Sequence, residues 1–409
     1  MRDHSTHKVG SRHEVIGALM SRWLFERRTE VVPVAQAQGR VCATTVVSKN
    51  QLPNALTCNM DAIAVRFDDF AQGMPDISGW ERGVQWQFAN TGIAMPEGFD
   101  TAIAIENVTV SEDNQTLEAL DCAPDERFQS TSMPGSTLEV GEVLVQAGEV
   151  LTPTLIACLT MGGHVEVEVV ARPRVMYIPT GNELVPAEIE LPRGKNVESN
   201  GNMICAKLEQ WGAEPRHHAI VPDDPDQILA ALREGTAWAD IVVINAGSSK
   251  GSDDWTCELL EREGEVLFHE VSQGPGRHCS FSLLDQKPVI GISGPPLGAE
   301  FTTDFFVKPF VDLYLGAAAD YPPTVMAVML DDCPSSPRPM SFVRRAVLRR
   351  DEDDQFVAWV HQADPDEPVL KGSNQANALI VVDKDSYGWE RGDRYPVELR
   401  YPYTLPPRL

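Results

Sequence analysis

Three short apolar runs constrain the fold of this chain more than any other feature of its sequence. They span residues 175–178, 241–244 and 289–292 and are rich in β-branched side chains. Nearly continuous runs of this kind are typical of strands that are buried on both faces of a mainly parallel sheet. Helical segments alternate with them, at about residues 202–211, 226–233 and 255–263. The alternation predicts a doubly wound α/β layer.

The segments that follow these three strands are expected to carry the chemistry, because ligands of doubly wound folds bind beyond the carboxyl ends of the strands. These segments are residues 180–183, 245–251 and 293–298. The last two are rich in glycine and precede a helix, so their backbone N–H groups can bind an anion with help from the helix dipole. We therefore predict two neighbouring phosphate-binding loops. The alternative for each loop is a tight strand-to-helix connection that binds no ligand.

Individual side chains strengthen the prediction of an anion site. Lys250 adds a positive charge to the first loop. Arg277, in the turn 273–278, offers a planar guanidinium that suits a phosphate or a similar oxyanion. The predicted phosphate-binding residues of the two loops are Gly247, Ser248, Ser249, Lys250, Gly251 and Gly294.

Three carboxylates stand out by their position. Glu183 lies just past a strand end, Asp254 lies beside the first loop, and Asp61 lies in an otherwise apolar segment. A carboxylate close to a phosphate is costly because the two charges repel. A Mg²⁺ ion, held by one or two carboxylates and by substrate phosphates, would remove that cost. The pair Asp223 and Asp224 is more simply explained as the cap of the helix that follows.

The charge balance excludes several classes of function. The chain has 409 residues, with 34 Lys plus Arg against 60 Asp plus Glu and a formal net charge of −26. A field this negative opposes binding to nucleic acid or to an anionic membrane. The polar first residues lack the apolar core of a secretory signal, and no run reaches the ~18 apolar residues of a membrane span. We expect a cytoplasmic protein whose eight scattered cysteines are reduced thiols.

The rest of the chain differs in character from the α/β segment. Apolar residues at helical spacing predict a helix near 15–24, and Thr152 with Pro153 predicts the start of another. Short alternating segments between about 46 and 141 predict a β-rich region. A small β domain is expected after residue 321, with the acidic run 351–354 at a hairpin tip.

Several motifs, in order along nearly the whole chain, resemble those of the molybdopterin molybdenumtransferase (MoeA) family, which includes the C-terminal part of gephyrin. Residues 59–66 resemble its Ala-Met-Asp-Gly-Tyr-Ala-Val signature, and residues 90–98 its Thr-Gly-x-x-x-Pro-x-Gly turn. Residues 172–184 resemble the strand that ends in Ser-Thr-Gly-Asp-Glu-Leu in that family. Three further segments also resemble motifs of that family, at residues 141–153, 220–225 and 370–378.

The resemblance implies a multidomain α/β fold. Its parts would be a helical linker region formed by 1–45 and 142–171, an inserted β-rich domain at 46–141, a MogA-like doubly wound α/β domain at 172–320, and a C-terminal β-barrel at 321–409. The family forms elongated homodimers. Each active site would lie between the α/β domain of one subunit and the β-rich domain of the other.

The resemblance also implies an activity, the insertion of molybdate into adenylylated molybdopterin with release of AMP and help from Mg²⁺. The matching catalytic residues are Asp61, Thr91, Glu183 and Asp254, of which Glu183 and Asp254 are also the expected metal ligands. The residues expected to bind the cofactor are Asp224, Gly247, Ser248, Ser249, Lys250, Gly251, Arg277, Gly294 and Pro296. Implied protein partners are a second copy of the chain, a molybdoenzyme and an upstream adenylyltransferase.

Departures from the family pattern lie in the loops that should carry the chemistry. Thr137 and Asn182 each replace a usual Asp, and Gly274 replaces the first Lys of Lys-Pro-Gly-Lys-Pro. The segment 245–251 reads Asn-Ala-Gly-Ser-Ser-Lys-Gly instead of Ser-Gly-Gly-Val-Ser-x-Gly, and 293–298 departs from Pro-Gly-Asn-Pro-Val-Ser. We hypothesise that Lys250 replaces the lost lysine charge. The chain is then either an insertase, for molybdate or for another oxyanion such as tungstate, or a non-catalytic paralogue that carries molybdopterin or the finished cofactor.

Overall fold

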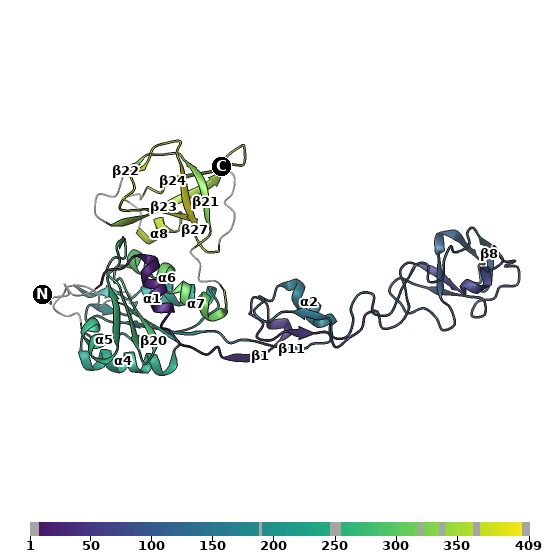
Figure 1. Ribbon diagram of the computed structural model, residues 1–409, viewed down its shortest axis with the longest axis horizontal. Coiled ribbons are helices and arrows are strands. Elements are labelled where there is room, and N and C mark those ends of the chain that lie inside the picture. Colours follow the sequence, from purple (N-terminus) through teal and green to yellow (C-terminus); the bar gives the residue numbers. More distant parts are fainter. Residues whose placement is uncertain are drawn as a thin grey trace. The chain divides into compact units, whose positions relative to one another are not determined.

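The computed structural model describes residues 8–187, 190–245, 255–317, 322–334, 340–362 and 369–402 (Figure 1). By internal contacts the chain divides into two compact units, Met1–Arg28 with Ala171–Leu409, and Thr29–Val170. The finer division into four domains stays a prediction. Among the described residues, none of the helices combines the length and the apolar character that a bilayer crossing requires.

The first unit contains the predicted doubly wound layer. Its sheet has the order β15-β12-β16-β20-β19-β17, in which the first four strands are parallel and the last two antiparallel to their neighbours. The strands are β12 (Arg174–Pro179), β15 (Glu214–His217), β16 (Ile241–Asn245), β17 (Glu265–His269), β19 (Ser280–Leu284) and β20 (Lys287–Ile292). Strands β12, β16 and β20 are the three apolar runs of the sequence, so the predicted parallel sheet is confirmed.

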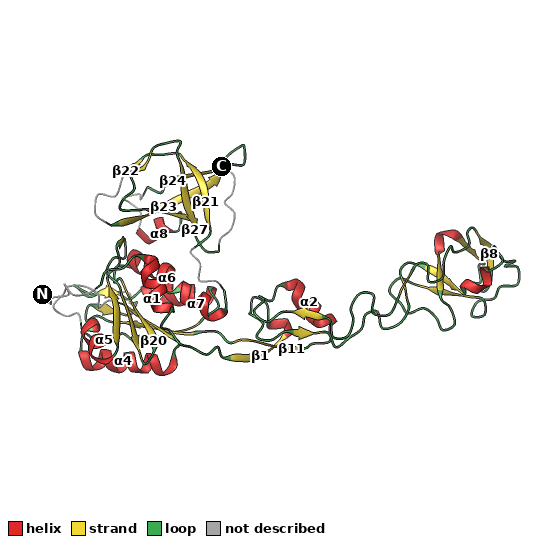
Figure 2. Cartoon of the chain, viewed as in Figure 1, coloured by secondary structure: helices red, strands yellow, loops and turns green. Residues whose placement is uncertain are grey.

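Helices cover both faces of this sheet (Figure 2). They are α1 (Arg12–Met20), α3 (Asn200–Gln210), α4 (Pro225–Trp238), α5 (Thr256–Glu263), α6 (Pro296–Phe306) and α7 (Lys308–Leu315). Helices α4 and α5 contact each other and the sheet, while α6 packs against α1, α3 and α7. One core cluster lies under α4 and includes Ile178, Leu232 and Ile244, all buried. The apolar character of both strand faces is therefore explained by burial under helices.

The C-terminal part of the same unit is a closed five-stranded barrel, as expected. Its strands are β21 (Thr324–Met329), β23 (Ser341–Arg350), β24 (Phe356–Val360), β25 (Ala378–Val382) and β27 (Arg394–Leu399). They pair in the order β23-β24-β21-β27-β25, and β25 pairs back to β23, which closes the ring. The acidic run 351–354 lies in the turn between β23 and β24, so the predicted hairpin tip is confirmed. The remaining elements are α8 (Val369–Ser373), β18 (Gln273–Gly274), β22 (Cys333–Pro334) and β26 (Gly388–Trp389).

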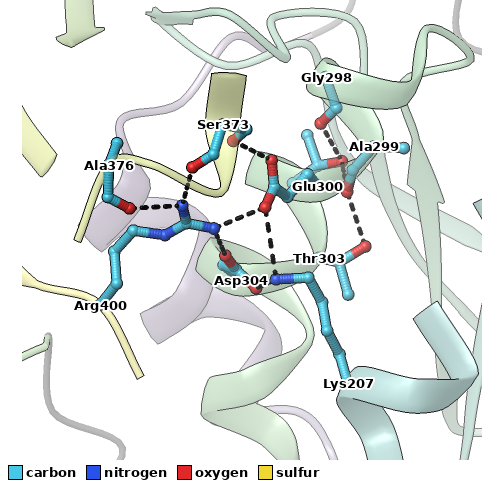
Figure 3. A network of polar contacts seen from close by, with 10 residues as sticks. Lys207, Gly298, Ala299, Glu300, Thr303, Asp304, Ser373, Ala376 and Arg400 are labelled. Carbon is cyan, nitrogen blue, oxygen red and sulfur yellow. Dashed lines mark hydrogen bonds and ion pairs between the residues drawn. The ribbon is translucent and has the colours of Figure 1, made fainter. Parts of the chain in front are cut away.

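A polar network joins helix α6 to the barrel (Figure 3). Arg400, just after β27, donates to Glu300 Oε1 at 2.5 Å, and Ser373 Oγ donates to Glu300 Oε2 at 2.7 Å. Lys207 of α3 donates to Asp304 Oδ1 at 2.8 Å. Glu300 is only 7% exposed, so its charge is neutralised by protein groups rather than by bulk water.

The second unit contains helix α2 (Pro153–Met161) and short antiparallel sheets. The predicted helix start is confirmed, because Thr152 Oγ1 accepts the N–H of Leu155 and Pro153 opens the helix. The strands beside α2 are β1 (Thr29–Pro33), β2 (Val46–Val47), β10 (Val143–Val145) and β11 (Glu166–Val170), with β1 pairing β11 and β2 pairing β10. Their core includes Leu151 and Leu159.

The predicted β-rich region has its own apolar core, which includes Ile63 and Trp86. Its central sheet is β5 (Trp86–Ala89), β4 (Ala62–Val65) and β6 (Thr101–Ala104), and the remaining strands are β3 (Thr57–Cys58), β7 (Val108–Val110), β8 (Leu117–Leu120) and β9 (Thr131–Ser132). All eight cysteines of the chain are free thiols, as expected.

Candidate functional site

A cleft of about 490 Å³ opens where the parallel strands of the first unit end. Glu183, after β12, and Asn245, at the end of β16, line it. The start of α3 adds Glu198 and Asn200, and the segment between β20 and α6 adds Gly294 and Pro296. This is the edge at which ligands bind in doubly wound folds. Three of the predicted site residues, Glu183, Gly294 and Pro296, are thus brought together in one cleft.

The Glu183 carboxylate lies against a glycine. A Cβ added to Gly181 would lie 2.5 Å from Glu183 Oε2, and the φ of Gly181 is 145°, which disfavours other residues. The same loop is fixed by Asn182, whose N–H donates to Asp223 Oδ2 at 2.9 Å and whose Oδ1 accepts the N–H of Asp223 at 3.2 Å. The substitution of the family's usual Asp by Asn182 thus lets this side chain face Asp223 without repulsion between two carboxylates.

The cleft offers oxygen ligands of the kind that Mg²⁺ prefers. Mg²⁺ is commonly held by one or two protein carboxylates plus substrate phosphates. Two carboxylates line the cleft, Glu183 and Glu198, and Glu198 is already bound by Tyr177, Gly201 and His217, so Glu183 is the one that fits this requirement. Among the described residues, no group of three or more His, Cys, Asp or Glu side chains is arranged to hold a metal ion by itself.

Asp224 caps a helix. Its Oδ1 accepts the N–H of Gln227 at 2.9 Å at the start of α4, so the capping explanation of the sequence is confirmed. Asp224 is not among the residues that line the cleft. Its contact with a cofactor stays a prediction.

Arg277 is held by a neighbouring carboxylate. Its Nε and Nη2 donate to Glu270 Oε2 at 3.0 and 2.8 Å, and His278 Nδ1 lies 3.2 Å from the other oxygen of Glu270. The Arg277 side chain is still 48% exposed, so part of its guanidinium faces solvent. Arg277 does not line the cleft. To act as the predicted anion clamp, its guanidinium would have to bind Glu270 and a ligand at the same time.

The first predicted phosphate loop cannot be placed. Gly247, Ser248, Ser249, Lys250, Gly251 and Asp254 lie outside the described residues. Their predicted roles, including the compensation by Lys250, stay predictions.

The last two predicted catalytic residues lie in the second unit and contact each other. Both the N–H and the Oγ1 of Thr91 donate to Asp61 Oδ1, at 3.2 and 3.1 Å. Asp61 directly precedes β4, and Thr91 lies in the turn after β5. The two residues, 30 positions apart, therefore form one local carboxylate–hydroxyl group.

The structure also shows a site residue that the sequence did not reveal. Glu198 is buried at the cleft, where it accepts the Tyr177 hydroxyl at 3.1 Å and the N–H of Gly201 at 2.8 Å. His217 Nε2 lies 3.2 Å from its second oxygen. Burial and then the Glu198 charge raise the pKa of Tyr177, so its hydroxyl remains a donor. One feature of the sequence could have identified Glu198: it lies directly before Ser199 and a helix, and the helix dipole favours a carboxylate at that position.

We expect Gly201→Ala to destabilise the α/β layer by about 1–3 kcal/mol, because a Cβ there would lie 2.4 Å from the His217 ring and force it away from Glu198. Urea unfolding of the purified variant measures the change. The matched control is Gly17→Ala in helix α1, where an added Cβ meets nothing within 4 Å. That change should be neutral or should stabilise by about 0.4–1 kcal/mol. Equal stability of the two variants would show that the contact between Gly201 and His217 is not tight.

Two family models match the chain. One is described as a probable molybdopterin binding domain and matches residues 176–312. The other is described as the MoeA N-terminal region (domain I and II) and matches residues 9–163. Together they include the cleft residues from Glu183 to Pro296 and the pair Asp61 and Thr91.

Curated relatives carry the name molybdopterin molybdenumtransferase. The protein of Staphylococcus aureus (strain COL) is 32% identical over 243 residues, which cover 59% of this chain and 57% of the relative. The protein of Staphylococcus epidermidis (strain ATCC 35984) is 25% identical over 319 residues, which cover 73% of this chain and 74% of the relative. The match thus spans little more than half the length of the first relative.

Two solved structures of molybdopterin biosynthesis MoeA proteins from Pyrococcus horikoshii share the fold. One is 23% identical with a TM-score of 0.79, and covers 96% of this chain and 99% of its own. The other, from strain OT3, is 26% identical with a TM-score of 0.72, and covers 96% and 100%. The similarity therefore extends over all the parts of the fold described above.

Proposed function

The chain belongs to the MoeA family, and from this premise we propose that it acts in molybdenum cofactor biosynthesis as an insertase. In the proposed reaction it takes molybdate and adenylylated molybdopterin, and releases AMP. The observation that supports this most directly is the cleft at the carboxyl ends of the parallel strands, which has the carboxylate of Glu183 and the start of helix α6 on its walls.

The proposed chemistry is electrostatic. Water attacks the phosphorus on the pterin side of the phosphoanhydride: a P–O bond to the water oxygen forms, the bridging P–O bond breaks, AMP leaves with the bonding electrons, and a proton of the water passes to solvent. Molybdate joins the pterin by exchanging oxygen ligands, which leave as hydroxide, so no oxidation state changes. The N–H of Gly294 and those of the first turn of α6 after Pro296 would hold phosphate oxygens, since Pro295 and Pro296 have no N–H. Mg²⁺, when bound by Glu183 and the substrate phosphates, would neutralise part of the negative charge that develops. We propose the same role for Asp254, which lies outside the described residues.

We further propose that the active site is completed in a homodimer. Asp61 and Thr91 would act from the partner subunit, as the family resemblance implies. The fixed hydrogen bonds between Thr91 and Asp61 orient one carboxylate oxygen and leave the other available for a ligand. Gly247, Ser248, Ser249, Lys250, Gly251, Asp224 and Arg277 complete the proposed set of cofactor contacts.

A carrier of molybdopterin or of the finished cofactor is the second candidate function. One observation favours it: Arg277 is already paired with Glu270, which weakens the only side-chain clamp that survives from the family's lysine turn. A carrier needs to bind the pterin but does not need to stabilise a developing charge. The two candidates therefore differ in catalysis and not in binding.

AMP release separates the two candidates. Purified protein is incubated with adenylylated molybdopterin, molybdate and Mg²⁺, and AMP is measured over time. We expect AMP to form only when molybdate and Mg²⁺ are both present, with tungstate tested in parallel. Tight binding of the pterin without AMP release would reject the insertase in favour of the carrier.

A further inference from the structure

Two asparagine side chains form a fixed amide pair inside the cleft. Asn200, at the first turn of α3, donates from Nδ2 to Asn245 Oδ1 at 3.1 Å and to the carbonyl oxygen of Gly294 at 2.9 Å. Both contacts are acceptors, and a carbonyl can only accept, so the nitrogen of Asn200 must face them. The pair therefore ties together three of the four segments that line the cleft, α3, β16 and the connection between β20 and α6.

This arrangement leaves one buried acceptor without a partner. Asn200 is 5% exposed, and its Oδ1 accepts no hydrogen bond from the residues that the structure describes. A buried amide oxygen that lacks a donor costs free energy unless a ligand or water supplies one. Since Asn200 lines the cleft, a bound ligand is in a position to supply that donor.

The charge around Asn200 restricts which end of a ligand can approach it. Asn200, Glu183 and Glu198 all line the cleft, and the oxygens of their side chains are acceptors. Acceptors of this kind attract N–H groups and disfavour phosphate or molybdate oxygens. On the wall at the start of helix α6, Gly294 has a backbone N–H that suits an anion, whereas Pro295 and Pro296 have none.

We infer that Asn200 is a specificity residue that accepts a hydrogen bond from the N–H-bearing pyrimidine edge of the pterin, while the phosphate end of the ligand faces α6. The inference rests on the proposed function and assigns an orientation within it. Asn245, which stands where the family usually has serine, acts as a positioning residue because its Oδ1 holds the Asn200 amide in place.

The test compares pterin with 3-methylpterin, which lacks the N3–H donor, and uses AMP as a probe without a pterin ring. Fluorescence titration gives the two pterin affinities, and calorimetry gives the AMP affinity. We expect wild-type protein to bind pterin about 10-fold more tightly than 3-methylpterin, the value of one well-placed hydrogen bond. Asn200→Leu should abolish that preference and leave AMP affinity unchanged. Asn196→Ala, at an exposed position of the same cleft, should change neither.

The loss or retention of the preference for pterin decides the role of Asn200. A 10-fold preference that is lost in Asn200→Leu, or in Asn200→Ser if the leucine variant does not fold, supports the inference. An unchanged preference in the folded variant overturns it, and so does a parallel loss of pterin and AMP affinity. Failure of the wild-type protein to bind pterin at all would contradict the proposed function itself, whereas pterin binding without the preference would contradict only the role of Asn200.

Discussion

Replacing Glu183 by glutamine should lower the rate of AMP release about 100-fold or more, the range seen when an electrostatic group is removed from an active site. Glutamine keeps the size of the side chain and its contact with Gly181 but removes the charge that would hold Mg²⁺. Turnover at saturating molybdate and adenylylated molybdopterin, measured across a Mg²⁺ titration, gives both the loss in kcat and the shift in Mg²⁺ requirement. We expect both to change.

Glu214→Gln is the matched control for this prediction. Glu214 starts β15 at the opposite, amino-terminal edge of the parallel strands, where it pairs with Arg174 at 3.3 Å and is 50% exposed. An exposed ion pair contributes little to stability, so this variant should keep wild-type turnover. If the Glu183→Gln variant keeps wild-type turnover and wild-type Mg²⁺ dependence, Glu183 has no role in catalysis.

The parallel part of the sheet could be predicted because burial on both faces leaves a clear mark in the sequence. The runs that became β12, β16 and β20 are apolar at nearly every position. Strands β17 and β19 leave no such mark, since polar residues such as Ser280 and Ser282 occur among their buried positions. Their place at the antiparallel edge of the sheet is decided by the pairing of β19 with β20 and of β17 with β19.

The helix caps were also predictable, because capping depends on residues that are close in sequence. Asp224 and Thr152 both accept an N–H three residues later. The polar contacts of the site depend instead on strand order. Glu198 meets His217 because β15 lies beside β12, and Asn200 meets Asn245 because β16 lies on the other side of β12. No spacing rule in the sequence reveals such pairs.

Arg277 illustrates the same limit for a single residue. Its charge and its place in a glycine-rich turn predict a free anion clamp, and both features are local. The structure pairs it with Glu270, at the end of the β17 segment, because the antiparallel pairing of β17 with β19 brings the two ends of the intervening loop together. Only the fold reveals that the clamp already has a carboxylate partner.

Replacing Glu300 by alanine should weaken the attachment of the barrel to α6 by about 2 kcal/mol, because charge-assisted hydrogen bonds are lost. Arg400 would lose its contact at 2.5 Å and Ser373 its acceptor, while Arg400 would keep Asp304 Oδ2 at 4.0 Å and Lys207 would keep Asp304 Oδ1 at 2.8 Å (Figure 3). Hydrogen exchange at the amides of β25 and β27 measures the free energy of local opening. In Glu300→Ala we expect exchange at the β25 and β27 amides to accelerate relative to wild type, and to accelerate more there than in the parallel sheet.

The contribution of Glu300 should also depend on pH. Burial pushes the pKa of Glu300 up, but Arg400, Ser373 and Lys207 outweigh it, so the pKa is lowered from its ordinary value of 4.5. A carboxylate with a lowered folded-state pKa stabilises fully above its unfolded-state pKa, and this stabilisation is lost as pH falls through the folded-state value. The difference between wild type and Glu300→Ala should therefore be constant near neutral pH and should shrink below pH 4.5.

Glu352→Ala serves as the control, because Glu352 is an exposed glutamate in the turn of the barrel hairpin β23–β24. Its removal should change the exchange of β25 and β27 by less than about 0.5 kcal/mol, as expected of a surface substitution. Glu300→Ala would then differ from this control by its buried partners and not by the loss of one negative charge from an acidic protein. An equal effect of both variants would show that the network in Figure 3 contributes no net attachment. A loss that does not diminish in acid would show that the contribution of Glu300 does not come from its charge.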